Sequence, residues 1–302
     1  MRHFFSPILR PALRGLMLAT LALSPQSDAL LAADLWDREN LLAWCIVPYD
    51  AKKRDPAARA EMLHTLGFRH FAYDWRAEHV ATFDAEVRAM KDRGIEITAW
   101  WFPTKLDDTA RRILEVIERH RIHPQLWVTG AGEAVTTPEE QTARIERELA
   151  RVRPIVQAAA RLGCVVGLYN HGGWFGDPDN QIAILKRLRA ERLENVRLIY
   201  NFHHGHDHLT DFAARWSRMA PYVDTVNLNG MIAGGDKGSD KIVTLANGEL
   251  ELGLMRTIQA SGWRGRVGIL NHRTDVDAAE GLQRNLAGLD RLAAQLRPAA
   301  KP

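Results

Sequence analysis

The sequence predicts an α/β protein, a (β/α)8 TIM barrel that forms a single domain after an N-terminal signal peptide. From residue 41 onward, eight short β-rich runs recur, and amphipathic stretches separate most of them. Apolar positions in these stretches recur every three or four residues, as in helices that cover a sheet. Alternating strands and helices imply parallel strands with right-handed crossovers, and eight such units match the usual length of a barrel. A doubly wound open sheet is the alternative.

The elements follow in regular order. The expected strands are 41–47, 69–74, 95–102, 124–130, 164–171, 196–204, 223–230 and 266–272. The expected helices are 55–67, 81–94, 107–121, 138–163, 180–193, 209–222, 249–262 and 277–296. Several helices end in a glycine that suits a C-cap, namely Gly67, Gly94, Gly163 and Gly262. No Gly-x-Gly-x-x-Gly follows an early strand, which argues against a dinucleotide-binding unit.

Residues 1–33 are set apart from the barrel as a signal peptide. Arg2, Arg10 and Arg14 precede the short apolar run 16–23, and small residues follow. This pattern is typical of a secretory signal, and the run is too short for a membrane span, which needs about 20 residues. An amphipathic helix on a cytosolic protein is the alternative. We therefore expect an exported protein, periplasmic or secreted, without a membrane span.

Composition excludes several other classes. Hydrophobic residues make up 46% and charged residues 25%, with a formal net charge of +3, as in globular proteins. No block of like charge suggests a nucleic-acid partner, and the sequence does not indicate an oligomeric state. Cys45 and Cys164 each lie in an apolar run, where buried free thiols are expected.

Polar and aromatic side chains gather at the carboxyl ends of the expected strands, where barrels place their functional residues. Asparagine donates and accepts hydrogen bonds, while Trp and Tyr offer flat apolar faces. This combination suits a polyhydroxylated ligand such as a sugar or polyol. The candidate substrate-binding residues are Asp74, Trp101, Tyr169, Asn170, Trp174, Asn201, Asn227, Asn229, Asn271 and His272. The candidate catalytic residues are His171, His204 and Glu133, since His and Glu can exchange protons near neutral pH.

Several motifs together resemble the xylose isomerase-like TIM-barrel superfamily, in its sugar phosphate isomerase/epimerase branch. They are GLYNHGGW (167–174), IYNFHHGHDHL (199–209), VNLNG (226–230), the stretch 246–270 and the final helix with Asn285 and Leu289. The resemblance covers about residues 40–295. It implies a sugar isomerase or epimerase with a divalent metal held at the ends of the later strands.

The metal ligands expected from this resemblance are replaced. Where family members carry carboxylates and a histidine, this chain has Tyr169, Asn201, Asn227 and Asn271. Neutral amides bring no charge to a divalent ion, so no cofactor is predicted. A zinc or manganese ion held by His171, His204 and His272 remains the alternative, because three imidazoles can hold zinc with one open position.

The histidine-rich stretch 200–208 is expected to contain the end of a strand and the loop that follows it. If the strand continues through His203 and His204, their side chains point to opposite faces, and the resemblance favours His204 in the mouth. Residues 206–208 are then expected in a solvated loop at the entry to the next helix. Glu133 lies in the loop after the fourth expected strand, as a general base or simply as a turn residue.

The sequence thus predicts an isomerase- or epimerase-like protein that acts on a carbohydrate or related polyol at the barrel mouth. A non-catalytic carbohydrate-binding protein derived from such enzymes is one alternative. A keto-sugar lyase or a hydrolase is another, and a glycoside hydrolase would need two carboxylates about 5–10 Å apart. Asp74 and Glu133 are the candidates for such a pair.

Overall fold

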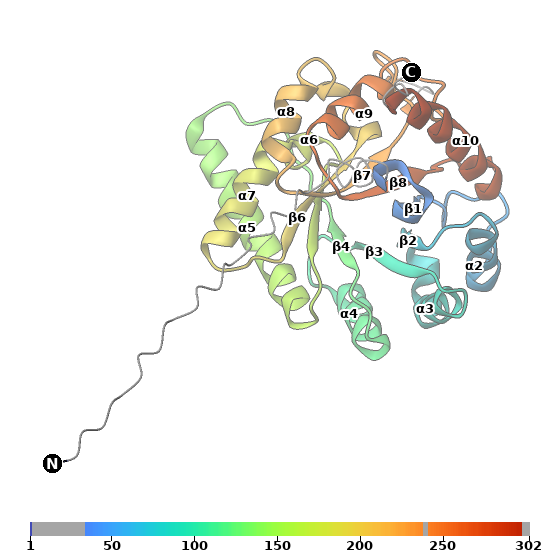
Figure 1. Cartoon of the computed structure of the whole chain (residues 1–302). Helices are drawn as coiled ribbons and strands as arrows, with labels where there is room; N and C mark the ends of the chain where they lie inside the picture. The colour runs from blue at the N-terminus through green and yellow to red at the C-terminus, as the bar shows by residue number, and fades with distance from the viewer. Residues whose placement is uncertain (2–33, 238–240, 298–302) are drawn as a thin grey trace. The chain divides into compact units, whose positions relative to one another are not determined.

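Eight parallel strands close into a barrel in chain order, with helices around the outside (Figure 1). The computed structural model describes Met1 and residues 34–237 and 241–297, so the expected signal peptide lies outside the described residues. The strands are β1 (Leu41–Trp44), β2 (His70–Tyr73), β3 (Glu96–Phe102), β4 (Gln125–Val128), β5 (Val166–Tyr169), β6 (Val196–Asn201), β7 (Val223–Leu228) and β8 (Arg266–Leu270). The predicted (β/α)8 barrel is confirmed.

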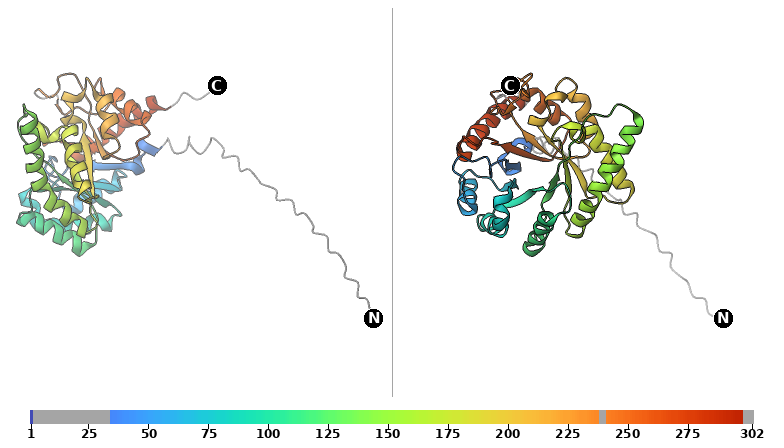
Figure 2. Two further views of the ribbon diagram at one scale, coloured as in Figure 1. Left: turned by 90° about the vertical axis from the view of Figure 1, so that its left-hand side faces the viewer. Right: turned by 180° about the vertical axis from the view of Figure 1, so that it is seen from behind.

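Helices alternate with these strands and form the outer layer, as Figure 2 shows from two further directions. They are α2 (Pro56–Thr65), α3 (Phe83–Asp92), α4 (Asp108–His120), α5 (Pro138–Arg161), α6 (Gly173–Gly176), α7 (Pro178–Ala190), α8 (Phe212–Met219), α9 (Glu251–Ala260) and α10 (Ala278–Leu296). Short 3₁₀ turns occupy Asp34–Trp36, Arg38–Asn40, Ala77–Thr82, Phe202–His204 and His206–His208. The four glycines expected to end helices all have positive φ, between 67° and 79°.

The sixth strand is shorter than the sequence pattern predicts. It ends at Asn201 instead of His204, because the Asn201 side chain accepts a hydrogen bond from the His203 backbone N–H at 3.2 Å. A side chain that bonds the backbone two residues ahead favours a turn over a continuing strand. The following 3₁₀ turn, Phe202–His204, reorients both histidines.

Two apolar regions hold the barrel together. The larger lies between the sheet and the helices, and the smaller fills the barrel interior with Trp44, Trp127, Tyr169 and their neighbours. Between α2 and α3, Arg59 and Glu86 form a fully buried ion pair with an N–O distance of 2.5 Å. Both cysteines are buried and free, as predicted.

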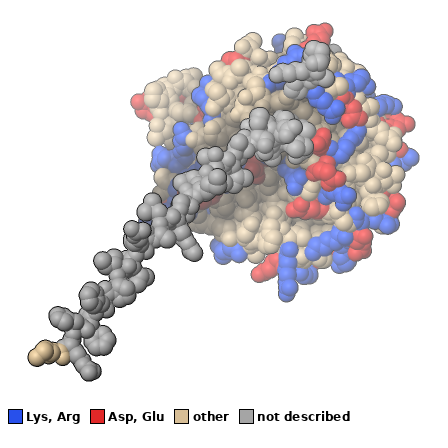
Figure 3. Space-filling model, in the orientation of Figure 1, with Lys and Arg blue, Asp and Glu red and all other residues tan. Residues whose placement is uncertain are grey.

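The surface carries both signs of charge. Lysines and arginines are interspersed with aspartates and glutamates over the face shown in Figure 3. None of the helices that the structure describes is long and apolar enough to cross a membrane.

Candidate functional site

A small chamber lies at the carboxyl end of the barrel, with a volume of about 40 Å³. Its walls come from the ends of β1, β2, β3, β5, β6 and β8. They are Trp44, Cys45, Tyr49, Asp74, Arg76, Trp101, Tyr169, His171, His203, His204 and His272. We call this space the inner chamber.

Asp74 brings a nearly unsolvated carboxylate to the inner chamber. The residue is 1% exposed, and its Oδ1 accepts a hydrogen bond from the Val47 backbone N–H at 3.2 Å. Its Oδ2 is buried without a hydrogen-bond partner among the described residues. Burial raises the pKa of Asp74 from 3.8 to about 6, although the nearby Arg76 guanidinium opposes this rise. A buried oxygen without a partner is costly, and such sites are often functional.

Arg76 and Tyr49 form the adjoining wall. Arg76 Nη1 donates to the carbonyls of Asp74 and Trp75 at 2.7 and 2.8 Å, which fixes the guanidinium beside its own strand. Its Nη2 lies 3.4 Å from Tyr49 Oη, and the Tyr49 ring packs edge-on against His272 at 4.0 Å. The chamber therefore has a fixed positive charge close to the Asp74 carboxylate.

Four imidazoles line the chamber in one continuous cluster, and His272 connects this cluster to Tyr49. Ring centroids lie 3.7 Å apart for His203 and His204, 4.3 Å for His171 and His204, and 4.8 Å for His203 and His272. The expectation that only one of His203 and His204 faces the mouth is wrong, because the strand ends before them. Both line the chamber.

These imidazoles are held in the neutral form. Burial, followed by repulsion from neighbouring imidazoles, lowers the pKa of His203 well below its usual range and that of His204 to about 2. Burial and the Arg76 charge lower the pKa of His272 to about 4. A neutral imidazole offers one N–H donor and one acceptor nitrogen.

This cluster predicts acid sensitivity of the fold. A histidine whose pKa is lower in the folded than in the unfolded state stabilises the fold above the unfolded pKa of about 6.5. That stability is lost as the pH falls below this value, because the unfolded chain binds protons that the native cluster excludes. In urea unfolding measured between pH 8 and 5, the urea concentration at the midpoint should decrease as the pH is lowered below 6.5. His203→Gln should flatten this dependence, and an unchanged slope in that variant would contradict the assignment.

Tyr169 joins the chamber to the aromatic interior of the barrel. Its hydroxyl is bonded to Trp44 Nε1 at 3.1 Å and to the Asn201 amide. Burial raises the pKa of Tyr169 well above its usual range, so the phenol stays protonated. Its ring lies 5.1 Å from that of Trp101, the other predicted stacking residue in the chamber.

The predicted asparagines serve mainly as ties within the scaffold. Asn170 donates to the Asn201 carbonyl at 3.1 Å and accepts from the Asn201 backbone N–H at 2.7 Å. Asn227 is fully buried, and its amide lies beside the Tyr169 hydroxyl. None of these three lines the inner chamber.

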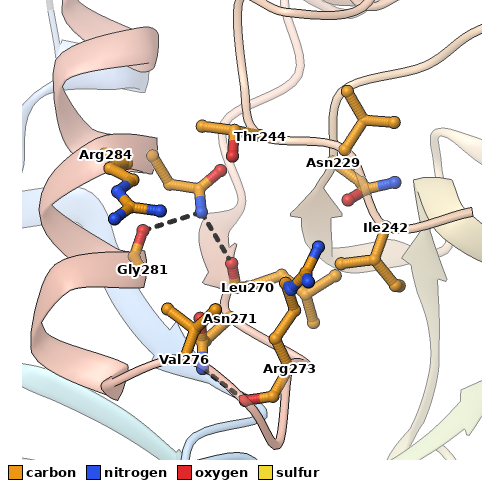
Figure 4. A pocket seen from close by; sticks show the side chains of 11 residues that line it. Asn229, Ile242, Thr244, Leu270, Asn271, Arg273, Val276, Gly281 and Arg284 are labelled. Atoms are coloured by element: carbon orange, nitrogen blue, oxygen red, sulfur yellow. Dashed lines mark hydrogen bonds between the residues drawn. The ribbon is translucent and has the colours of Figure 1, made fainter. Parts of the chain in front are cut away.

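Asn229 and Asn271 face a different cavity, of about 170 Å³, between β8, α10 and residues 242–244 (Figure 4). The Asn271 amide donates to the Tyr49 carbonyl at 2.6 Å and to the Arg273 carbonyl at 3.3 Å. The Asn229 amide donates to the carbonyls of Gly230 and Lys241. The structure therefore separates these two predicted binding residues from the histidine cluster.

A larger cleft of about 450 Å³ adjoins the inner chamber, and His204 lines both. We call this space the outer cleft. It contains the remaining predicted residues, Glu133 and Trp174. The Trp174 indole donates to Gln141 at 2.7 Å, and its ring stacks under Arg144 at 5.5 Å. Glu133 and Asp74 line different cavities, so no described pocket joins the carboxylate pair that a glycoside hydrolase requires.

The expectation of a solvated loop at residues 206–208 is only partly right. Asp207 is exposed, but His208 is buried, with its Nδ1 3.0 Å from Tyr200 Oη. His206 Nδ1 lies 3.2 Å from the His203 carbonyl. His208 is buried because its ring forms a hydrogen bond with the buried Tyr200 hydroxyl.

Side chains at the ends of β5 and β8 are engaged within the protein. Tyr169 is a neutral phenol bonded to Asn201, and Asn271 is turned into the cavity beside α10. Among the residues that the structure describes, no group of three His, Cys, Asp or Glu side chains is arranged to hold a metal ion. The His171 and His204 rings lie 4.3 Å apart, but with His272 they do not form such a group.

The sequence did not single out several chamber residues, namely Trp44, Cys45, Tyr49 and His203. Cys45 and His272 have positive φ values of 52° and 53°, and the His272 N–H donates to the Cys45 carbonyl at 3.1 Å. Non-glycine residues adopt this conformation only where the surroundings enforce it. Such backbone geometry leaves no mark in the sequence pattern.

Several solved structures have a fold similar to that of this chain. No family model matches the sequence, and no curated protein does. The 3-keto-D-glucoside 4-epimerase from E. coli shares 17% identity and a TM-score of 0.59 over 85% of this chain and 99% of its own. D-psicose 3-epimerase from Clostridium cellulolyticum H10 shares 13% identity and a TM-score of 0.54, over 85% and 96%. The IOLI protein, solved with a bound zinc atom, shares 10% identity and a TM-score of 0.64 over 86% of this chain and 100% of its own. At these identities the likeness establishes the fold, a (β/α)8 barrel.

Proposed function

We propose that this protein is an enzyme that isomerises or epimerises a carbohydrate or related polyol, with Asp74 as its general base. The observation that carries the proposal is the free, buried Oδ2 of Asp74, which lines the same chamber as four neutral imidazoles. A carboxylate with a pKa of about 6 is well matched to proton abstraction near neutral pH. The fold is shared with sugar epimerases, and this likeness supports the same chemistry only by analogy.

The chemistry follows from these groups. Asp74 Oδ2 takes the proton from the carbon beside a sugar carbonyl, and the electron pair of that C–H bond moves to form an enediolate. Neutral imidazole N–H groups of His204 or His272 donate to the developing oxygen anion, as oxyanion donors do. For an isomer, Asp74 returns the proton to the neighbouring carbon on the same face, and an imidazole transfers the hydroxyl proton of that carbon to the former carbonyl oxygen. For an epimer, a water molecule on the opposite face supplies the proton to the same carbon, and the hydroxide that remains takes the proton held by Asp74.

The proposal includes independence from a metal. In this interpretation Tyr169, Asn201, Asn227 and Asn271 stand where related enzymes hold their ion. The enediolate is stabilised by hydrogen bonds instead of a Lewis acid. Elemental analysis of the purified protein, with His204→Ala beside it, tests this point. Stoichiometric zinc or manganese that disappears in the variant would overturn it.

Deuterium exchange tests the function itself. The purified protein would be incubated in D₂O with D-fructose, D-tagatose, D-psicose and a 3-keto-glucoside, with and without EDTA, and followed by NMR. We expect deuterium to appear beside the carbonyl of at least one sugar and to be unaffected by EDTA. His204→Ala should slow the exchange.

A non-catalytic carbohydrate-binding protein is the second candidate. It is favoured by Asn201, Asn227 and Asn271, because neutral amides cannot exchange protons as the carboxylates and histidine of related enzymes do. Sugar binding without exchange at any pH would support this candidate and contradict the enzyme. The export that the N-terminal residues predict remains part of the proposal and is tested by cell fractionation.

A further inference from the structure

The two adjoining cavities differ in size by an order of magnitude. The inner chamber, at about 40 Å³, is far smaller than the sites that small molecules usually occupy. The outer cleft, at about 450 Å³, lies within the range of about 300–1,000 Å³ that small-molecule sites occupy. A ligand that reaches the inner chamber therefore has most of its room in the outer cleft.

His204 is the wall between the two spaces, because it lines both. No hydrogen bond to another described residue fixes either its side chain or that of His171. The two rings are held by contact with each other at 4.3 Å and with the neighbouring rings of His203, Tyr169 and Trp101. Displacement of these rings thus breaks no described side-chain hydrogen bond. A molecule bound in the outer cleft can then place one end beside Asp74.

The outer cleft is built to accept hydrogen bonds from hydroxyl groups. Glu133 and Asp207 both line it, both are exposed, and neither forms an ion pair or hydrogen bond with another described residue. Arg215, the cation in the lining, is instead bonded to Asp177 and Asp211 at 3.0 and 2.8 Å. The two carboxylates are therefore free to accept from a ligand.

The walls of this cleft are fixed in place. The Trp174 backbone N–H donates to the Gly132 carbonyl at 2.8 Å. A Cβ on Gly173 would lie 2.9 Å from that carbonyl oxygen, so the two loops approach as closely as glycine allows. Binding there meets a preformed surface, which lowers its entropic cost.

We propose that the outer cleft binds a second sugar unit of the same molecule, so that the substrate is a glycosylated sugar and not a free monosaccharide. This inference rests on the proposed function, since it places the reacting carbonyl end of the first unit beside Asp74. Glu133 and Asp207 bind hydroxyls of the second unit, and Glu133 takes no part in the proton transfer.

Binding and exchange with matched sugars test the inference. The probes are D-fructose and the four glucosyl-fructoses turanose, maltulose, leucrose and isomaltulose, which differ in the linkage position. Affinity is measured by calorimetry and exchange by NMR in D₂O. We expect at least one disaccharide to bind at least tenfold more tightly than D-fructose, a difference of about 1.4 kcal/mol.

Variants of the outer cleft test the disaccharide inference separately from the proposed enzymatic function. Glu133→Gln combined with Asp207→Asn should abolish the advantage of the disaccharide, whereas Glu118→Gln, an exposed change on α4, should keep it. Equal affinity for D-fructose and every disaccharide, or an advantage that survives the double change, would overturn the inference while exchange still supports the function. If no probe binds and none exchanges, the proposed function and the inference both fail.

Discussion

Asp74→Asn is expected to slow exchange beside the sugar carbonyl by about 10²–10⁴-fold, the usual contribution of a general base. The amide has the same shape and keeps an oxygen for the Val47 backbone N–H, but it cannot take a proton. The rate constant of deuterium incorporation, measured by NMR at saturating sugar, gives the size of the effect. A rate within threefold of the parent would remove Asp74 from the mechanism.

The pH dependence of the same reaction provides an independent check. Because the base must be ionised, the rate of the parent protein should fall as the pH drops through the Asp74 pKa of about 6. Exchange that persists in Asp74→Asn should lack this transition. A parent profile that is flat from pH 5 to 8 would argue against the assignment.

The stability of Asp74→Asn distinguishes the loss of a catalytic base from damage to the fold. The folded-state pKa of Asp74 lies above its ordinary value of 3.8, so at neutral pH the buried charge destabilises the native state by roughly 3 kcal/mol. The penalty disappears as the pH falls through about 6 towards 4, where the carboxyl becomes neutral in both states. Asp74→Asn should therefore unfold in urea at no lower midpoint than the parent at pH 7.

Glu86→Gln is expected to destabilise the fold by about 3–5 kcal/mol, because it leaves the Arg59 charge buried without its partner. Both side chains are almost completely buried, at 2% and 0% exposed, in the contact between α2 and α3. Urea unfolding at pH 7, followed by circular dichroism, measures the loss. The double change Arg59→Met with Glu86→Leu should recover most of it, since it removes both charges together.

A surface pair between the same two segments serves as the control. Arg93 and Glu61 lie 2.7 Å apart, but their side chains are 49% and 53% exposed. Glu61→Gln should cost less than about 1 kcal/mol. A loss in Glu86→Gln as small as that in Glu61→Gln would show that water reaches Arg59 in solution.

The barrel could be predicted from the sequence because it depends on periodicity. Apolar runs of strand length alternate with helical stretches along the whole chain, and the polar ends of the runs mark the mouth. The direction in which each side chain turns could not be predicted in the same way. His203 enters the chamber because β6 ends at Asn201, and Asn271 leaves it because its amide bonds the Tyr49 and Arg273 carbonyls. A shift of two or three residues in a strand end decides such cases.

Residues from the first strand were the hardest to foresee. Cys45 and Tyr49 read as the end of an apolar run and the start of a loop, with no motif around them. They reach the chamber through the pairing of β1 with β8, which joins segments more than 220 residues apart. Contacts of this kind follow from closure of the barrel and not from any local pattern.

That pairing has a consequence for biosynthesis. The hydrogen bonds from Asn271 and His272 to the carbonyls of Trp44 and Cys45 extend the seam between the first and last strands. A ribosome that has not yet translated codon 266 holds a chain in which β1 has no partner on one side and His272 is missing from the chamber. Loop closure over such a separation is slow compared with local pairing. Premature termination anywhere before this codon would therefore yield a polypeptide without the chamber, however much of the sheet it had formed.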